Sequence, residues 1–147
     1  MKISDELFPY FMKAGQQIHY HKNDLIYMQQ DDAQNLYVIL NGRVRVFIVN
    51  SMGDVVDFAT LSKGEIFGDS SFLQNSYRPT NVQAVRETDL ISCQINDLYP
   101  YLTESKELTI SLLSTLTQNC NYLSDLVKKA YTYNRLKFRT SKMASLI

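Results

Sequence analysis

The apolar residues of this chain change their spacing near residue 95, and this change limits the folds that the chain can adopt. Between residues 16 and 94, apolar residues occur in short runs separated by turn signals. Between residues 105 and 133 they recur every three or four positions, and neither proline nor glycine interrupts the pattern. Short alternating runs indicate strands, whereas the longer spacing indicates a helix. We therefore expect a β domain followed by a long α-helix.

The first region predicts seven or eight short strands. Apolar runs occur at 18–20, 25–28, 36–40, 44–49, 55–61, 82–85 and 90–95. Asn41-Gly42 separates two of these runs and is a strong signal for a tight hairpin turn. A short helix is expected at residues 4–14, with Ser4 as its cap and Gly15 at its end. Regularly spaced short strands favour a β-barrel or jelly roll, so the expected class is mainly β with α.

The long helix carries an apolar seam with alternating spacings of three and four residues, as in a heptad repeat. A lone helix of this length cannot bury so much apolar surface against a small β domain. We therefore expect a homodimer that forms through this helix. The predicted dimer interface consists of Leu113, Leu116, Cys120, Leu123, Val127 and Ala130.

A further helical pattern begins at residue 140 and stops at an apolar residue, Ile147. Helices rarely end in this way, so the pattern predicts the first turns of a second domain that is missing from the chain. The expected organisation is a β domain at residues 1–104, a dimerisation helix at 105–136 and the start of the second domain at 137–147.

The charge balance argues against nonspecific binding of nucleic acid by the chain as a whole. Lys and Arg number 15 in total and so do Asp and Glu. The segment from Lys128 onward has six basic residues and no acid, so it either approaches a polyanion or forms a solvated helix face.

Neither cysteine, Cys93 or Cys120, has a CxxC partner. We therefore expect both to be small core residues of a protein in a reducing compartment. Because neither a signal peptide nor a membrane-spanning run is recognisable, we expect a cytoplasmic protein without membrane contact.

Residues 64–69, with the sequence Gly-Glu-Ile-Phe-Gly-Asp, form a candidate anion-binding loop together with Arg78. Glycine permits positive φ and close backbone approach, so several N–H groups can point at one ligand. Arginine adds a planar fork of donors that matches phosphate or carboxylate. The alternative is a surface arginine that pairs with Asp69 or Glu65 beside an empty pocket.

In this order, the segments resemble the cyclic-nucleotide-binding effector domain of the Crp/Fnr transcription regulators. Residues 36–46 are similar to the family's LYxIxxGxVxV hairpin, 50–54 to its polar turn, 63–69 to its xGxxFGE loop and 78–84 to its RxAxxxA strand entry. The resemblance covers essentially the whole chain. It implies a double-stranded β-helix, or jelly roll, a small-molecule effector, and DNA binding through the missing winged helix-turn-helix domain.

The resemblance also implies which residues contact the effector. Arg78 would hold its anionic group, and Asp69 would accept a hydrogen bond from a ribose hydroxyl. The expected effector-binding residues are Gly68, Asp69, Ser70, Ser71, Arg78, Pro79, Thr80 and, from the long helix, Lys128.

Two of these positions depart from the family pattern. Asp69 stands where glutamate is usual and is one methylene shorter, and Pro79 replaces a Ser or Thr. Proline removes a hydroxyl and a backbone donor together. We therefore expect a small anionic effector, and we expect cyclic AMP to bind weakly or not at all.

The sequence gives little support for metal binding or catalysis. His19-Tyr20-His21 places two imidazoles on one side of a strand, as in cupins. The third histidine of the cupin pattern is absent because the chain has only two, so we expect no metal site, haem or iron–sulfur cluster. Neither a nucleophile–base pair nor paired carboxylates occur at a credible spacing, so we expect no enzymatic activity.

Three functions remain open from the sequence. The chain is the effector-sensing and dimerisation region of a Crp/Fnr-like regulator, a stand-alone cyclic-nucleotide-binding module that acts on a partner protein, or a ligand-free dimerisation domain. The first is favoured because residues 138–147 resemble the first helix of the family's DNA-binding domain.

Overall fold

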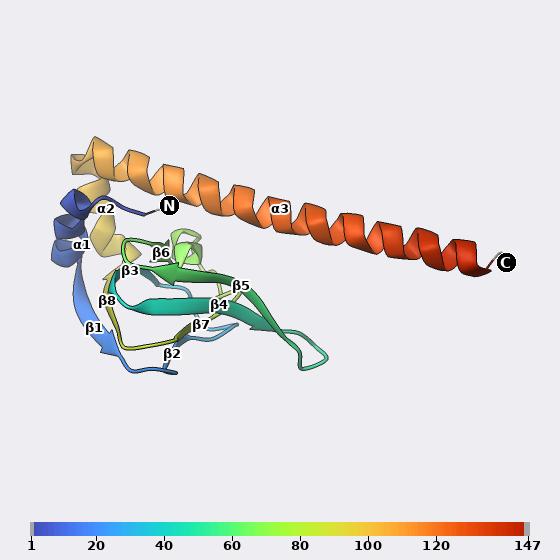
Figure 1. The fold of residues 1–147 in the computed structure, drawn as a ribbon. Coiled ribbons are helices and arrows are strands. Elements are labelled where there is room, and N and C mark those ends of the chain that lie inside the picture. Colours follow the sequence, from blue (N-terminus) through green and yellow to red (C-terminus); the bar gives the residue numbers. More distant parts are fainter. Residues whose placement is uncertain (1, 146–147) are drawn as a thin grey trace.

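The structure is a computed structural model that describes residues 2–145, and the side chains of residues 2–129. A β-roll lies beside a long helix whose later turns extend beyond it (Figure 1). The helical elements are η1 (Asp5–Leu7), α1 (Phe8–Ala14), η2 (Asp69–Phe72), α2 (Ile95–Glu104) and α3 (Lys106–Ser145). The strands are β1 (Gly15–Tyr20), β2 (Leu25–Tyr27), β3 (Asn35–Asn41), β4 (Arg43–Val49), β5 (Val55–Ser62), β6 (Ile66–Phe67), β7 (Asn81–Ala84) and β8 (Thr88–Gln94).

The eight strands of the described chain form two four-stranded antiparallel sheets. One sheet has the order β1-β8-β3-β6 and the other the order β2-β7-β4-β5. Strand β1 pairs with β8, which lies far along the sequence, and Ile18 stands opposite Leu90. This arrangement confirms the predicted jelly roll with a short N-terminal helix and a long C-terminal helix.

The predicted hairpin at Asn41-Gly42 is wrong. Strands β3 and β4 flank this turn but belong to different sheets, so they are not hydrogen-bonded neighbours. Gly42 has a φ of 105°, and a Cβ there would lie 2.5 Å from Oγ1 of Thr88. The turn is therefore a corner that takes the chain from one sheet to the other beside β8. The paired hairpin is instead β4–β5, in which Val49 stands opposite Val55.

The sheet that contains β3 and β8 is buried on both faces. Tyr37, Ile39 and Leu90 face the interior of the roll and pack on Phe67 and Val82. The alternate residues of the same strands face the helices, where the second cluster forms. That cluster includes Leu36, Val38, Ile91 and Cys93, with Phe11 of α1, Leu98 of α2, and Leu108 and Leu112 of α3. Burial on both faces explains why these strands are continuous apolar runs.

The N-terminal helix differs from the expectation in one detail. Ser4 makes no capping hydrogen bond through its side chain, and the first turn is the 3-10 helix η1. Gly15 ends α1 as predicted.

Helix α3 is longer than expected. It continues without interruption to Ser145, so the predicted separate helix from residue 140 is not separate in the described part, and Ile147 lies outside it. Residues 106–145 contain neither proline nor glycine, and the helix therefore has no local stop signal. The domain boundaries at 104/105 and 136/137 stay predictions.

Candidate effector-binding site

Arg78 is an interior residue rather than a surface arginine, with an exposed fraction of 2%. Its Nη1 donates to the carbonyl oxygen of Gly68 at 3.0 Å and to the hydroxyl of Ser70 at 3.3 Å. Its Nη2 donates to the carbonyl oxygen of Asn35 at 2.6 Å. The guanidinium carbon lies 4.2 Å from the ring centre of Tyr27. Arg78 therefore joins the loop after β6 to the start of β3, and the alternative of surface pairing with Asp69 or Glu65 is wrong.

The positive charge of Arg78 has no carboxylate partner among the described residues. Its polar contacts are two carbonyl oxygens and one hydroxyl, and its Nε is buried without a hydrogen-bond partner. Glu65 accepts from the backbone N–H of Ser62 at 2.6 Å instead. Because an unpaired buried charge is unfavourable, an anion that approached this guanidinium would gain binding energy.

Gly68 allows the loop to approach the arginine closely. Its φ is 85°, in the left-handed region, and it precedes the 3-10 helix η2. A Cβ at this position would lie 2.8 Å from the carbonyl oxygen of Asn35 and 3.1 Å from Nη1 of Arg78. Glycine is therefore required here both for the backbone conformation and for the space.

A cavity of about 390 Å³ lies between the roll and α3, within the size range of small-molecule sites. Its roll side is mainly apolar. The lining residues from the roll are Tyr27, Gln29, Val46, Ile48, Phe58, Ala59, Leu61, Ile66, Phe67, Gly68, Asp69, Pro79 and Thr80. Asp69 is the single lining residue with a charged side chain. Tyr27 also lines the cavity, and burial raises the pKa of its phenol to about 12. Tyr27 and Gly68 also contact Arg78, so the guanidinium lies one residue behind the cavity wall.

The helix side of the cavity is formed by Asn119, Tyr122 and Leu123. The hydroxyl of Tyr122 donates a hydrogen bond to the carbonyl oxygen of Phe58 in β5. Lys128, the expected contact from the helix, is exposed and is not among the lining residues. Asn119 and Tyr122 were not predicted from the sequence, although both flank seam positions and are polar enough to indicate a site beside the seam.

The expected effector residues do not all meet in one cavity. Gly68, Asp69, Pro79 and Thr80 line the cavity below α3, and Ser70 contacts Arg78. Ser71 lines a second hollow of about 440 Å³ on the other side of η2.

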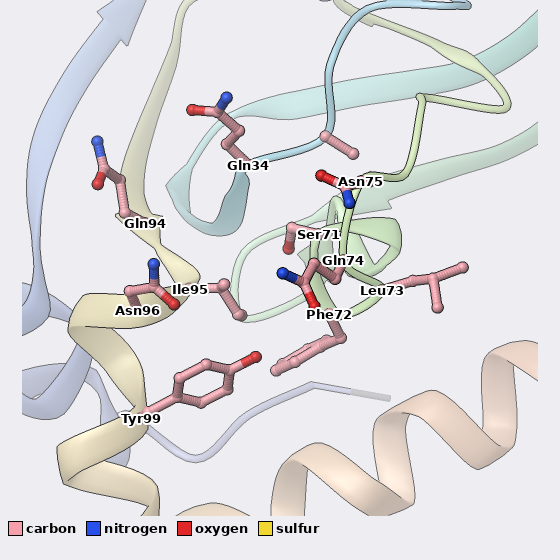
Figure 2. A pocket seen from close by; sticks show the side chains of 11 residues that line it. Gln34, Ser71, Phe72, Leu73, Gln74, Asn75, Gln94, Ile95, Asn96 and Tyr99 are labelled. Carbon is pink, nitrogen blue, oxygen red and sulfur yellow. The ribbon is translucent and has the colours of Figure 1, made fainter.

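Figure 2 shows this second hollow between the η2 loop and the start of α2. It is rich in side-chain amides, and its lining residues include Gln34, Gln74, Asn75, Gln94 and Asn96. None of its lining residues belongs to α3. A ligand there would therefore have no direct contact with the long helix.

The expected dimer seam is largely exposed along α3. The exposed fractions are 58% for Leu113, 48% for Leu123 and 67% for Val127, and Cys120 is exposed as well. Leu116 is half-buried, and the side chain of Ala130 lies outside the described part. Such a row of exposed apolar side chains is typical of a contact surface.

The two cysteines differ from each other. Cys93 is a core residue as predicted, and its thiol donates to the carbonyl oxygen of Phe11 at 3.3 Å. Burial, followed by the nearby charge of Asp97, raises the pKa of Cys93 to about 12. Cys120 is exposed, so its prediction as a core residue is wrong for the single chain.

The architecture of two antiparallel sheets rolled around a common core places the chain in the jelly-roll class. A model of the cyclic nucleotide-binding domain matches residues 17–105, and the chain belongs to that family. The matched region contains all eight strands except the first residues of β1. No helix of the described residues is long and apolar enough to cross a membrane.

Among curated proteins, the chain is similar to the cyclic AMP receptor protein of Thermus thermophilus. The two are 28% identical over 130 residues, which cover 84% of this chain and 59% of the relative. It is also similar to lysophospholipase nte1 of Aspergillus oryzae, with 26% identity over 69% of this chain and 7% of the relative. The chain thus spans less than two thirds of either protein.

Among solved structures, the catabolite activator protein of Thermus thermophilus matches with a TM-score of 0.68 and 26% identity, over 85% of this chain and 60% of that chain. A transcriptional regulator from Thermotoga maritima matches with a TM-score of 0.73 and 19% identity, over 83% of this chain and 92% of that one. At this identity the second match supports the fold alone.

Proposed function

We propose that this chain is the effector-sensing and dimerisation region of a Crp/Fnr-like transcription regulator. The observation that carries the proposal is the position of Leu123, which lines the cavity and also belongs to the exposed apolar seam of α3. A ligand in the cavity would touch the same side chain that a partner helix would cover. Ligand contacts that differ between two helix arrangements would shift the dimer between them.

Tyr122 offers a second route from ligand to helix. Its hydroxyl bond to Phe58 joins α3 to β5, and its side chain lines the cavity. An effector that displaced this tyrosine would release that connection and free the helix to move. In the complete protein, such a movement would change the orientation of DNA-binding domains attached beyond residue 147. In this proposal the protein is cytoplasmic, has no catalytic activity, and contacts DNA only through those domains.

The proposed effector is a small anion with an apolar body. The apolar lining suits the body, and the unpaired charge of Arg78 behind Gly68 and Tyr27 attracts the anionic group. Cyclic AMP is expected to bind weakly or not at all. Pro79 supplies neither a hydroxyl nor a backbone N–H, and the short carboxylate of Asp69 lies on the same wall.

A thermal-shift screen with a cavity-filling variant tests the proposal. The compounds are cyclic AMP, cyclic GMP, cyclic di-GMP and small aromatic carboxylates. Ala59→Trp fills the cavity from β5, whereas Thr60→Trp, at the next and exposed position of the same strand, is the matched control. An effector of this cavity raises the Tm of the wild type and of the control but not that of Ala59→Trp. An equal shift in all three proteins would place binding elsewhere.

The second candidate is a regulatory module that acts on a partner protein or partner domain. It is favoured by the match to a short part of lysophospholipase nte1, a much longer protein. Sequencing the gene beyond residue 147 distinguishes the two functions. A helix-turn-helix pattern supports the regulator, whereas an immediate stop codon or a continuation into a different kind of domain supports the module. If no compound in the screen binds, the third function remains, which is a ligand-free dimerisation domain.

A further inference from the structure

The histidines at the end of β1 lie next to two carboxylates of β8 and the turn before it. His19 stands opposite Asp89 in the antiparallel register, and Tyr20 stands opposite Thr88. Residues two apart on a strand share a face. His19 and His21 therefore lie on the same face as Asp89 and Glu87, at the β1 edge of the sheet. None of these four residues lines the cavity below α3.

Glu87 lies between the two imidazoles. Its Oε2 is 3.2 Å from Nε2 of His19, and its two carboxylate oxygens are each 3.1 Å from Nδ1 of His21. One nitrogen from each imidazole and one oxygen of Glu87 lie within 4.8 Å of one another. The sequence contains no third histidine, but the fold supplies a carboxylate in its place.

Two of these three separations are close to those around a tetrahedral zinc ion. With zinc bonds of about 2.0–2.2 Å to nitrogen and oxygen, neighbouring ligand atoms lie roughly 3.3–3.6 Å apart. Two of the three edges, from Glu87 to each histidine, are already close to this length. The remaining separation, between the imidazole nitrogens, is at most 4.8 Å, and rotation of these exposed side chains would have to shorten it for an ion to bind.

Asp89 supplies the supporting contact that a metal-binding histidine needs. Its Oδ1 lies 2.7 Å from Nδ1 of His19, the nitrogen on the opposite side of the ring from Glu87. When Nδ1 carries the proton and donates a hydrogen bond to this carboxylate, the lone pair of Nε2 points toward Glu87. Metal-binding histidines almost always have such a carboxylate or carbonyl partner, which fixes the tautomer and the ring orientation.

We propose that His19, His21 and Glu87 bind one zinc ion, with Asp89 as the positioning residue for His19. The nitrogen and oxygen ligands suit zinc rather than calcium or magnesium, which prefer oxygen ligands alone. The three protein ligands leave a fourth position for water. The ion would fasten the edge strand β1 to the turn before β8, in place of the ion pairs that now connect them.

Isothermal titration of untagged protein with zinc chloride at pH 7.5 tests this site. The expected result is one ion per chain, with affinity at least about tenfold weaker in His19→Ala, His21→Ala and Glu87→Gln. Asp89→Asn should weaken binding by about tenfold, as the loss of a supporting carboxylate does in other zinc sites. Magnesium chloride should give no saturable binding. A zinc-dependent rise in Tm in the wild type, absent in His21→Ala, is the second readout.

Two control variants keep the result interpretable. Asp57→Asn removes an exposed carboxylate of β5 that pairs with Arg45 at 3.8 Å, and it should leave zinc affinity unchanged. Among the described residues, Cys120 has the exposed thiol, which could bind zinc in competition with the proposed site. Cys120→Ser removes this thiol and should also leave the affinity unchanged. Loss of binding in Cys120→Ser, unchanged binding in Glu87→Gln, or no saturable binding by the wild type would each overturn the proposal.

Discussion

Replacement of Arg78 by alanine should strongly destabilise the roll, even without any effector. The side chain is 2% exposed and joins the Gly68 loop to Asn35 at the start of β3. The truncated side chain cannot reach either carbonyl oxygen. The loop would then lose its connection to the sheet, and a void would remain beside Tyr27.

The size of the effect follows from the groups left unpaired. The carbonyl of Asn35 loses its donor, which costs about 1–3 kcal/mol. The carbonyl of Gly68 keeps the backbone N–H of Ser71 at 3.1 Å, so it loses one net hydrogen bond of about 1 kcal/mol, and the longer bond to Ser70 adds less. Removing an unpaired buried charge offsets part of this loss. The expected decrease in the free energy of unfolding is therefore about 2–4 kcal/mol, a large share of the roughly 5–15 kcal/mol typical of a domain. Arg78→Met, which keeps the apolar stem, should cost less than Arg78→Ala.

Urea denaturation followed by far-ultraviolet circular dichroism measures this difference, at one fixed protein concentration because the chain is expected to dimerise. Tryptophan fluorescence is unsuitable since the chain has no tryptophan. Arg86→Ala is the matched control, because Arg86 is exposed and its loss should change stability by less than about 0.5 kcal/mol. If Arg78→Ala is no more destabilising than Arg86→Ala, the buried bonds of Arg78 do not hold the loop as described.

Three further predictions concern other parts of the molecule. Gly68→Ala should lower the free energy of unfolding by about 1–3 kcal/mol more than Gly53→Ala, since both have a φ of 85° but a Cβ has free space only at Gly53. Leu123→Glu should yield monomers in light scattering, and an unchanged dimer mass would place the interface elsewhere. The hydrogen bond that His19 donates to Asp89, and more weakly the one to Glu87, raises the pKa of His19 above 6.5, which an NMR titration in metal-free buffer measures. The stability from this pair is complete below pH 6.5 and is lost as the pH rises through the folded pKa, and a midpoint at or below 6.5 would contradict it.

The sequence predicted the jelly roll because its signals are local. The strand runs and turns at residues 16–94, and the spacing within α3, depend on neighbouring residues alone. The role of Asn41-Gly42 was not predictable in this way. The same left-handed glycine closes a hairpin or turns a corner between sheets, and the choice depends on the pairing of β3 with β8, far along the chain.

The candidate site was predicted in part for a similar reason. The glycine loop directly follows β6, and the wall residues Pro79 and Thr80 directly precede β7. Their place in the cavity could therefore be predicted from the neighbouring strands. The direction in which Arg78 points was not predictable, since its acceptors include a carbonyl at the start of β3. Glu87 beside His19 and His21 was missed because a carboxylate 66 and 68 residues away leaves no spacing signal in the sequence.

The central place of β8 has a consequence for synthesis on the ribosome. Strands β1 and β3 both pair with β8, so residues 15–20 and 35–41 wait for residues 88–94 before their sheet can form. Until then β1 and the apolar strand β3 emerge without their common neighbour, and a nascent chain in this state is prone to aggregation. Folding should therefore be concerted and slow compared with that of a helical domain of equal length. A fragment that ends before Thr88 should remain unfolded, however complete the first seven strands are.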